Sequence, residues 1–513
     1  MVAGTTTYRP ATSASDVGAV LDVLGRAGLI TEVPATSTVA VLDTFDGRIA
    51  DAGLRLELVD GHQLMLRGDG VVAARVAVAG QPRIAADVPA GPLRGRLARL
   101  LDVRALLRLV EVTSERIDAQ LRNGTGKVTV AAAVHQSPSA GGVGLDDSVL
   151  VEVRELAGYP KPAAELREEI ERIGFVKIDG GLAELAARSA GVPLGGYAIS
   201  VGVPLAADYT AIDGFRAVLA NLRDAMLANW DGVVADVDPE FLHDLRVAVR
   251  RTRVVLGNAK RVLPEEVRQQ AREDFAWLGG ISGTARDLDV YQIEWPEYTA
   301  ALDDTATESL VPLREHLGVL RQAAHVELAA QLTSAGAAEV VERWSDWLDH
   351  PVDVTTFGDR SVEALTKTVR RRVRRAHNVM IDRGRSITAE TPADTVHELR
   401  KDAKKLRYLI ECFGGLYDKA SRAAFVSRLK ALQDVLGEHQ DAEVHAHALR
   451  TIADDTQQRW SADTLLAIGQ LIERLEQRRV ASRNDLAERF AEFDRKETAK
   501  ALKELLASAG AKR

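Results

Sequence analysis

The stretch His243-Asp244-Leu245-Arg246 decides the fold of the second half of this chain, because the sequence contains it twice. Its second copy, His397-Glu398-Leu399-Arg400, begins 154 residues later. Further cations follow at the same offsets in both copies: Arg250, Arg251 and Arg253, then Lys404, Lys405 and Arg407. Another block repeats with the same offset, as Leu278, Gly283, Asp287 and Val290 and then Leu432, Gly437, Asp441 and Val444. One offset shared by two blocks indicates a duplicated helical unit.

Each copy predicts a helix with two separate faces. In a helix over residues 238–260, one arc of roughly 80° holds His243, Arg246, Arg250 and Arg253. The same arc in the second copy holds His397, Arg400, Lys404 and Arg407, with Lys401 at its edge. A separate apolar stripe, Leu245, Val249 and Leu256 in the first copy, can pack inward.

The spacing of the cations predicts an anion site. Basic runs on helices are ordinarily solvated and paired with acids at i,i+4, but here cations repeat at i+3, i+4 and i+7. Such spacing costs on the order of a few tenths of a kcal/mol per pair in an isolated helix. Guanidinium forks match phosphate oxygens and lysines add point charges, so a series along a helix suits a polymeric phosphate.

The bulk properties set the class of protein. The chain has 513 residues, which is too many for one ordinary hydrophobic core. Its composition, 46% hydrophobic and 27% charged residues, is typical of globular proteins. A net charge of −8 disfavours a general nucleic-acid binder but allows a local cationic site. A single cysteine, Cys412, and the lack of a signal peptide or a long apolar run predict a cytoplasmic protein with no membrane segment.

The pattern along the chain predicts two domains. Residues 1–190 are expected to be α+β, with a linker at 191–211 and an all-α bundle at 212–510 in two similar halves, about 212–350 and 360–510. The expected strands are Thr38–Leu42, Gly53–Val59, Gln63–Leu66, Val71–Val78, Lys127–Val134 and Ser148–Val153. The expected helices of the first domain are Ala14–Ala27, Gly91–Leu107 and Pro162–Ile173.

The pattern His-x-Leu-Arg-x-x-x-(Arg/Lys)-(Arg/Lys)-x-Arg, present twice, resembles the conserved histidine α-helical domain, CHAD, over about residues 210–510. The resemblance implies a pseudo-two-fold helical bundle that binds inorganic polyphosphate in a basic groove. The predicted polyphosphate-binding residues are His243, Arg246, Arg250, Arg251, Arg253, His397, Arg400, Lys401, Lys404, Lys405 and Arg407. No cofactor or metal is expected, because neither histidine has metal-ligand spacing to other residues, and His439, His445 and His447 are interpreted as surface residues.

Residues 1–190 are similar to a diverged CYTH domain, an antiparallel β-barrel of the triphosphate tunnel metalloenzymes. The similarity rests on Asp43-Thr44-Phe45-Asp46 with Gly53-Leu54-Arg55, and on Val151-Glu152-Val153-Arg154. Such enzymes need carboxylates for a divalent metal, yet Thr5-Thr6-Thr7-Tyr8-Arg9 stands where a Glu-x-Glu-x-Lys motif is expected.

Two further departures, Glu57 in place of a tunnel cation and Arg154 in place of an acid, predict a catalytically inactive domain. Arg55, Arg67 and Arg75 are open to two interpretations, phosphate binding or ordinary sheet-surface charge.

These features favour a non-enzymatic polyphosphate-binding protein, and the resemblance also implies association with polyphosphate granules. The enzyme alternative is a metal-dependent triphosphatase or polyphosphatase in the N-terminal domain. A third class is a scaffold or nucleic-acid-associated protein that uses the same basic face. The sequence leaves open the preferred polyphosphate length, whether both domains share one ligand, and the oligomeric state.

Overall fold

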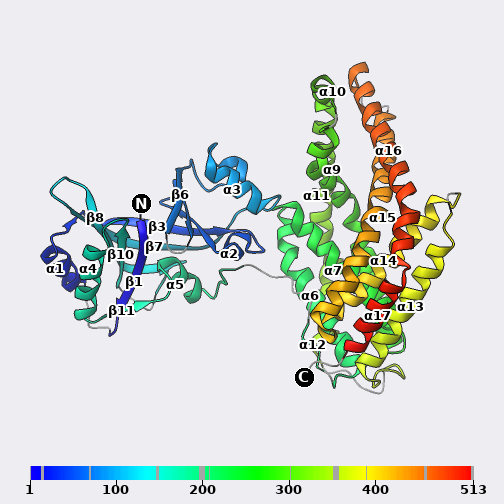
Figure 1. Ribbon diagram of the computed structural model, residues 1–513, viewed down its shortest axis with the longest axis horizontal. Helices are drawn as coiled ribbons and strands as arrows, with labels where there is room; N and C mark the ends of the chain where they lie inside the picture. Colours follow the sequence, from blue (N-terminus) through cyan, green and yellow to red (C-terminus); the bar gives the residue numbers. More distant parts are fainter. Residues whose placement is uncertain are drawn as a thin grey trace. The chain divides into compact units, whose positions relative to one another are not determined.

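The computed structural model divides the chain into two compact units, Met1–Ile199 and Ser200–Arg513 (Figure 1). It describes residues 2–12, 17–68, 71–145, 149–195, 203–206, 208–300, 302–350, 357–388, 390–455 and 459–509. The predicted linker at 191–211 lies partly outside these residues, and its boundaries stay a prediction.

The first unit is an antiparallel sheet with short helices. Its strands are β1 Val2–Pro10, β2 Ile30–Thr31, β3 Ala35–Asp43, β4 Leu54–Val59, β5 Gln63–Gly68, β6 Val71–Ala77, β7 Leu107–Arg122, β8 Val128–Ala140, β9 Val143–Gly144, β10 Val149–Leu156 and β11 Phe175–Ile178. Its helices are α1 Val17–Arg26, α2 Arg48–Asp51, α3 Pro92–Leu101, α4 Pro160–Arg172 and α5 Leu182–Ser189, with a 3-10 turn, η1, at Ala85–Asp87.

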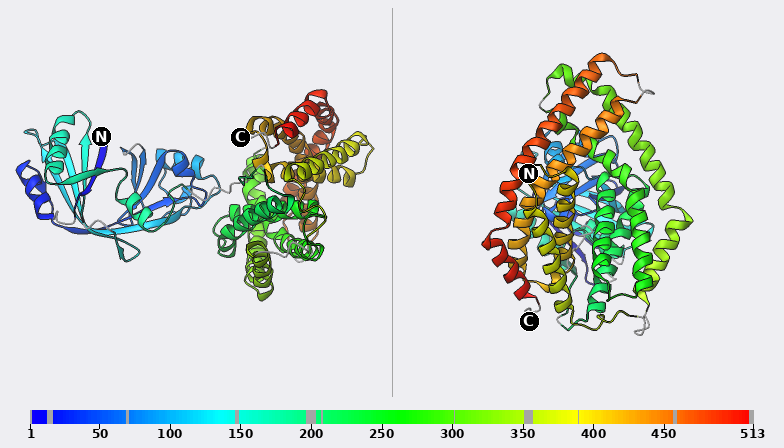
Figure 2. Two further views of the ribbon diagram at one scale, coloured as in Figure 1. Left: turned by 90° about the horizontal axis from the view of Figure 1, so that it is seen from below. Right: turned by 90° about the vertical axis from the view of Figure 1, so that its right-hand side faces the viewer.

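The main strand order is β11-β1-β10-β8-β7-β3-β4-β5-β6, and all the pairings are antiparallel. The sheet curls into a half-barrel, whose trough is seen in the left view of Figure 2. Along the second half of β7 the two faces differ: Ile117 and Ala119 pack into the core on one face, while Arg116 and Asp118 line the trough on the other. The predicted α+β class is confirmed.

For this unit the end of one predicted helix was wrong, and two of the longer strands were missed. The helix expected over Gly91–Leu107 ends at Leu101, because the next residue, Asp102, has a left-handed φ of 54° that a helix cannot contain. The strands β1 and β7 were not predicted. Charged residues interrupt the alternation of β7, since its polar face lines the trough rather than solvent alone.

The second unit consists of helices throughout its described residues. They are α6 Ala211–Val234, α7 Pro239–Asn258, α8 Glu265–Ile281, α9 Gly283–Thr299, α10 Asp304–Ser309, α11 Val311–Leu332, α12 Ala335–Asp349, α13 Leu365–Arg385, α14 Ala393–Cys412, the 3-10 turn η3 Gly414–Leu416, α15 Lys419–Ala453, α16 Ala462–Phe493 and α17 Lys496–Ser508. The predicted all-α class is confirmed. None of these helices is long and apolar enough to cross a bilayer.

Helices α7 and α14 are the two copies of the basic repeat. Their bounds differ by the repeat offset of 154 residues at both ends, and the two helices pack against each other. The right view of Figure 2 shows the helices of the first copy in green beside those of the second in yellow to red. Asp238 caps α7 by accepting hydrogen bonds from the backbone N–H groups of Glu240 and Phe241 at 2.9 and 3.3 Å.

The apolar stripes of α7 and α14 are buried as predicted. Leu245, Val249 and Leu256 of α7 are fully buried, and so are Leu399 and Leu406 of α14. Burial of such side chains contributes about 1.5–3 kcal/mol each and fixes the rotation of both helices. The opposite, cationic faces are thereby turned toward a common surface.

Candidate anion-binding groove

A groove of about 790 Å³ lies between α7, α8 and α14. Its lining is Arg250, Arg253, Val254, Gly257, Asn258, Gln269, Arg272, Glu273, Ala276, Lys401, Lys404, Lys405 and Tyr408. Six of these side chains are cationic and one is acidic, so the groove is strongly electropositive. We call it the α7/α14 groove.

Five of the predicted residues line this groove: Arg250, Arg253, Lys401, Lys404 and Lys405. They come from both copies of the repeat, so the structure brings the two basic runs together in one place.

Sequence reasoning missed Arg272, Tyr408, Asn258 and Gln269. Arg272 comes from α8 and has valine at its equivalent position, Val426, so the repeat gave no signal for it.

The groove lies next to the pseudo-two-fold axis of the domain, on the side of α8. Arg250 and Lys404 are equivalent positions of the two copies, and each lies within the electrostatic reach of the other. Tyr291 and His445 are also equivalent, and the Tyr291 hydroxyl donates to the His445 carbonyl at 3.3 Å. Equivalent residues can meet in this way only at the axis between the copies.

The second repeated block positions the arginines of the first. Arg246 donates through Nη1 to the Gly279 carbonyl at 3.1 Å and to the Ser282 hydroxyl at 2.8 Å. Its equivalent, Arg400, donates to Asp441 at 2.9 Å.

Gly283 and Gly437 lie next to these two guanidinium groups, at a distance that an added methyl group would also tolerate. A Cβ at Gly283 would stand 4.0 Å from Arg246 Nη1, and one at Gly437 would stand 3.8 Å from Arg400 Nη2. In both copies the second block thus lies against the guanidinium of the first arginine of the basic run, and neither Arg246 nor Arg400 lines the groove itself.

Four cations of the groove form no ion pair with any described carboxylate: Arg250, Arg253, Arg272 and Lys404. Burial, reinforced by Arg400 and Arg250, lowers the pKa of Lys404 to about 8. Burial, reinforced by Arg250, also lowers the pKa of Arg246 to about 10. Positive charge is thus concentrated beyond what the protein itself compensates.

Other predicted cations are paired with acids of the protein, including Arg251, Arg407 and Lys405. Arg251, 9% exposed, donates to Glu411 at 2.9 Å and stacks over Tyr408 at 5.6 Å, so it holds α7 against α14. Arg407 donates to Gln433 at 2.9 Å and pairs with Glu411 at 3.1 Å. Neither lines the groove, whereas Lys405 lines it while paired with an acid of its own helix.

Neither predicted histidine is among the groove residues. The His397 Nδ1 lies 2.5 Å from Gln440 Oε1, so a residue of α15 holds this ring. The interpretation of the later histidines as surface residues was wrong for two of them, because His439 and His445 are 3% and 7% exposed. Burial lowers the pKa of His445, whose Nδ1 contacts the Tyr298 hydroxyl.

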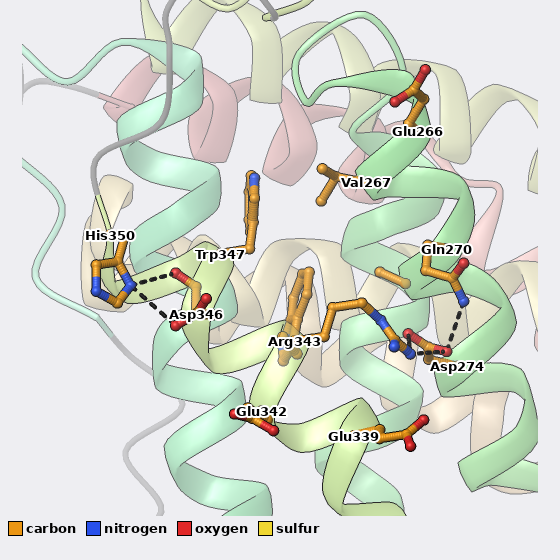
Figure 3. Close-up of a pocket in the computed structure, with 12 residues that line it drawn as sticks. Glu266, Val267, Gln270, Asp274, Glu339, Glu342, Arg343, Asp346, Trp347 and His350 are labelled. Atoms are coloured by element: carbon orange, nitrogen blue, oxygen red, sulfur yellow. Dashed lines mark hydrogen bonds and ion pairs between the residues drawn. The ribbon is translucent and has the colours of Figure 1, made fainter. Parts of the chain in front are cut away.

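A second hollow, of about 920 Å³, lies between α8 and α12 and has the opposite charge (Figure 3). Its acidic residues are Glu266, Asp274, Glu339, Glu342 and Asp346. Its two basic side chains are paired with these acids, Arg343 with Asp274 at 3.0 Å and His350 with Asp346 at 3.3 Å. The two faces of α8 therefore differ in sign, and only the α7/α14 groove suits an anion.

The trough of the N-terminal half-barrel, about 550 Å³, holds the other predicted cations, Arg55, Arg67 and Arg75. Glu57 pairs there with Arg55 at 2.7 Å and with Arg67 at 2.5 Å. The acid at position 57 thus pairs with two of the three cations and offsets one of their charges.

A second paired cluster comes from β7 and β10 and was not predicted. Asp118 accepts from Arg116 at 2.8 Å and from Arg154 at 2.6 Å. Burial alone would raise the pKa of Glu152, but His135, Arg154 and other nearby cations outweigh it and lower this pKa. Among the described residues, no three His, Cys, Asp or Glu side chains are grouped so as to hold a metal ion.

The fold and groove define a helical domain of two similar halves with a cationic surface at their pseudo-axis. Residues 217–450 match the CHAD domain family, so a CHAD domain is present in this chain.

Two uncharacterized proteins of Mycobacterium tuberculosis, from strains CDC 1551 / Oshkosh and ATCC 25618 / H37Rv, are each 27% identical over 253 residues. The match covers 47% of this chain and 47% of each relative, so the chain spans about half the length of the curated relatives it matches.

Three solved structures are similar in part. The CHAD domain of the plant Ricinus communis is 26% identical with a TM-score of 0.47, covering 56% of this chain and 94% of that one. PptA from Streptomyces chartreusis is 17% identical with a TM-score of 0.42, covering 55% and 99%. The adenylyl cyclase candidate HpAC1 from Hippeastrum, described as having a dominant triphosphatase activity, is 14% identical with a TM-score of 0.25, covering 38% and 99%.

Proposed function

We propose that the CHAD domain of this protein binds inorganic polyphosphate in the α7/α14 groove without catalysing a reaction. One observation carries the proposal: Arg250 and Lys404 line one groove from equivalent positions, act on each other's charge, and form no ion pair with a described carboxylate. Such like charges repel unless an anion lies between them. A ligand that brings several negative charges relieves repulsion across the whole groove.

The chemistry of the lining favours phosphate chains over single carboxylates. Arg250, Arg253 and Arg272 offer planar forks for phosphate oxygens, and Lys404 adds a point charge. Arg250 and Arg253 lie about one helical turn apart, near 5 Å along α7. A polymeric anion can contact these two arginines and the other groove cations at the same time, which one small anion cannot do for the whole groove.

The proposal assigns no hydrolysis to the N-terminal trough. Metal-assisted phosphoryl chemistry needs carboxylates that are free to coordinate a cation. Glu57 and Asp118 are each held by two arginines, so a metal would have to displace guanidinium groups to reach them. A phosphate-release assay with Mg²⁺ or Mn²⁺ tests this part, and release above that of a heat-denatured sample would contradict it.

The binding site is tested by charge reversal in the full chain. Arg250→Glu with Lys404→Glu should abolish most binding of long-chain polyphosphate in a fluorescence titration. The matched control is Arg343→Glu with Lys503→Glu, which changes the net charge equally on helices that do not line the groove. Equal loss in both variants would mean that net charge, and not this groove, drives binding.

Specificity is tested by competition at one salt concentration. Nucleic acids, including a short duplex DNA, extend beyond the groove, and the protein's net charge of −8 disfavours binding there. Polyphosphate should therefore displace a short duplex DNA. DNA that competes equally well, phosphate for phosphate, would support a nucleic-acid-associated function instead.

A further inference from the structure

Three lysines of α14 line the groove, but their surroundings differ. Lys401 pairs with Glu398 at 2.8 Å and Lys405 with Asp402 at 3.2 Å. Lys404 stands between them and forms no ion pair with a described carboxylate. It is half-buried, while Lys401 and Lys405 are exposed.

The groups that face Lys404 come from four helices. Arg400 and Arg407 of its own helix and Arg250 of α7 act on its charge, and Arg272 and Glu273 of α8 share the groove. Asp441 of α15 acts in the opposite direction, but it accepts a hydrogen bond from Arg400 at 2.9 Å. The net effect, led by burial, lowers the pKa of the Lys404 amine to about 8.

A lysine in such surroundings is a nucleophile near neutral pH. With a pKa near 8 instead of the ordinary 10.4, the neutral amine is about 200-fold more abundant at pH 7.5. The same cations that free this amine also attract phosphate groups. The groove therefore combines a phosphate-binding surface with a reactive amine inside it.

We propose that Lys404 is an acylation site that accepts acyl groups from acyl phosphates held in the α7/α14 groove. This rests on the proposed anion binding, because the groove recognises the phosphate of the donor. The Nζ lone pair attacks the acyl carbonyl carbon and forms an amide bond. The bond from that carbon to the phosphate oxygen breaks, its electron pair leaves with the phosphate, and one proton passes from nitrogen to solvent. The product has lost the Lys404 charge, so acylation weakens the polyphosphate site.

The test incubates the full chain with acetyl phosphate and follows each lysine by peptide mass spectrometry. Lys404 should be acetylated at least tenfold faster than Lys401 and Lys405, its controls on the same helix. The rate at Lys404 should rise up to about pH 8 and then level off. Tripolyphosphate should protect Lys404 against acetyl phosphate. Equal rates at all three lysines would overturn the inference.

An uncharged acetylating ester and a polyphosphate titration separate the two proposals. If polyphosphate binds and the ester prefers Lys404 but acetyl phosphate does not, the acyl-phosphate inference fails alone. If Lys404 remains the preferred site of acetyl phosphate while polyphosphate does not bind, the proposed function fails and the acylation site stands.

Discussion

Raising the salt concentration should weaken polyphosphate binding by an amount that the groove itself sets. The four unpaired cations are Arg250, Arg253, Arg272 and Lys404, so about four counterions are released from the bound polymer. Lys401 and Lys405 do not count, because each would exchange an existing ion pair for a new one. With a coefficient of about 0.7 per contact, as for single-stranded polyanions, the logarithmic slope is about −2.8. Affinity should then fall about 50-fold between 50 and 200 mM NaCl.

The assay is a fluorescence anisotropy titration with end-labelled polyphosphate at several salt concentrations. Arg250→Gln with Lys404→Gln removes two contacts, so the slope should fall by about 1.4 and the loss of affinity to about 7-fold. Arg343→Gln, in the acidic hollow, should leave the slope unchanged. A slope that does not change in the double variant would refute the assignment of these contacts to the groove.

Three further outcomes are expected. Polyphosphate affinity should fall about 5- to 10-fold as pH rises from 7 to 9.5, because Lys404 is charged below its pKa of about 8 and neutral above it. The variant Lys404→Arg stays charged over this range, so its affinity should change less with pH. Arg251→Met should lower the free energy of unfolding in urea by about 1–3 kcal/mol, since it breaks a largely buried ion pair, and a loss of affinity without a loss of stability would contradict that role. Gly384→Ala should lower the free energy of unfolding by about 1–3 kcal/mol, because its Cβ would clash with the Phe490 ring. Gly469→Ala, in open space, should raise the free energy of unfolding by about 0.5–1 kcal/mol. Shifts of the melting temperature in the reverse directions would refute the packing argument.

The sequence predicted what local periodicity and duplication encode. The repeat placed α7 and α14 correctly, because a helix turns its apolar and cationic stripes to opposite sides wherever it packs. It could not find Arg272, whose place in the groove depends on how α8 crosses α7. It also assigned Arg251 to the ligand, since the pairing partner Glu411 is 160 residues away in the sequence.

Contacts between distant residues were also missed in the half-barrel. The motif comparison detected Glu57 in place of a tunnel cation and Arg154 in place of an acid, but not that each departure creates an ion pair inside the trough. Arg116 and Asp118 were missed because β7 itself was missed. Pairing across a curled sheet brings together residues from distant strands, and one sequence does not reveal that register.

The two copies of the repeat differ at a position where a second acid would reduce the positive charge of the groove. Arg251 and Lys405 are equivalent, but Arg251 has Glu411 as its partner across the axis, while the equivalent of Glu411 is Gly257. Lys405 therefore lacks such a partner and turns to Asp402 on its own helix instead. A duplicated acid at position 257 would place a carboxylate in the groove lining and cancel charge there. Because Glu411 and Gly257 differ, Glu411 can hold α14 against α7 through Arg251, while Gly257 adds no negative charge to the groove.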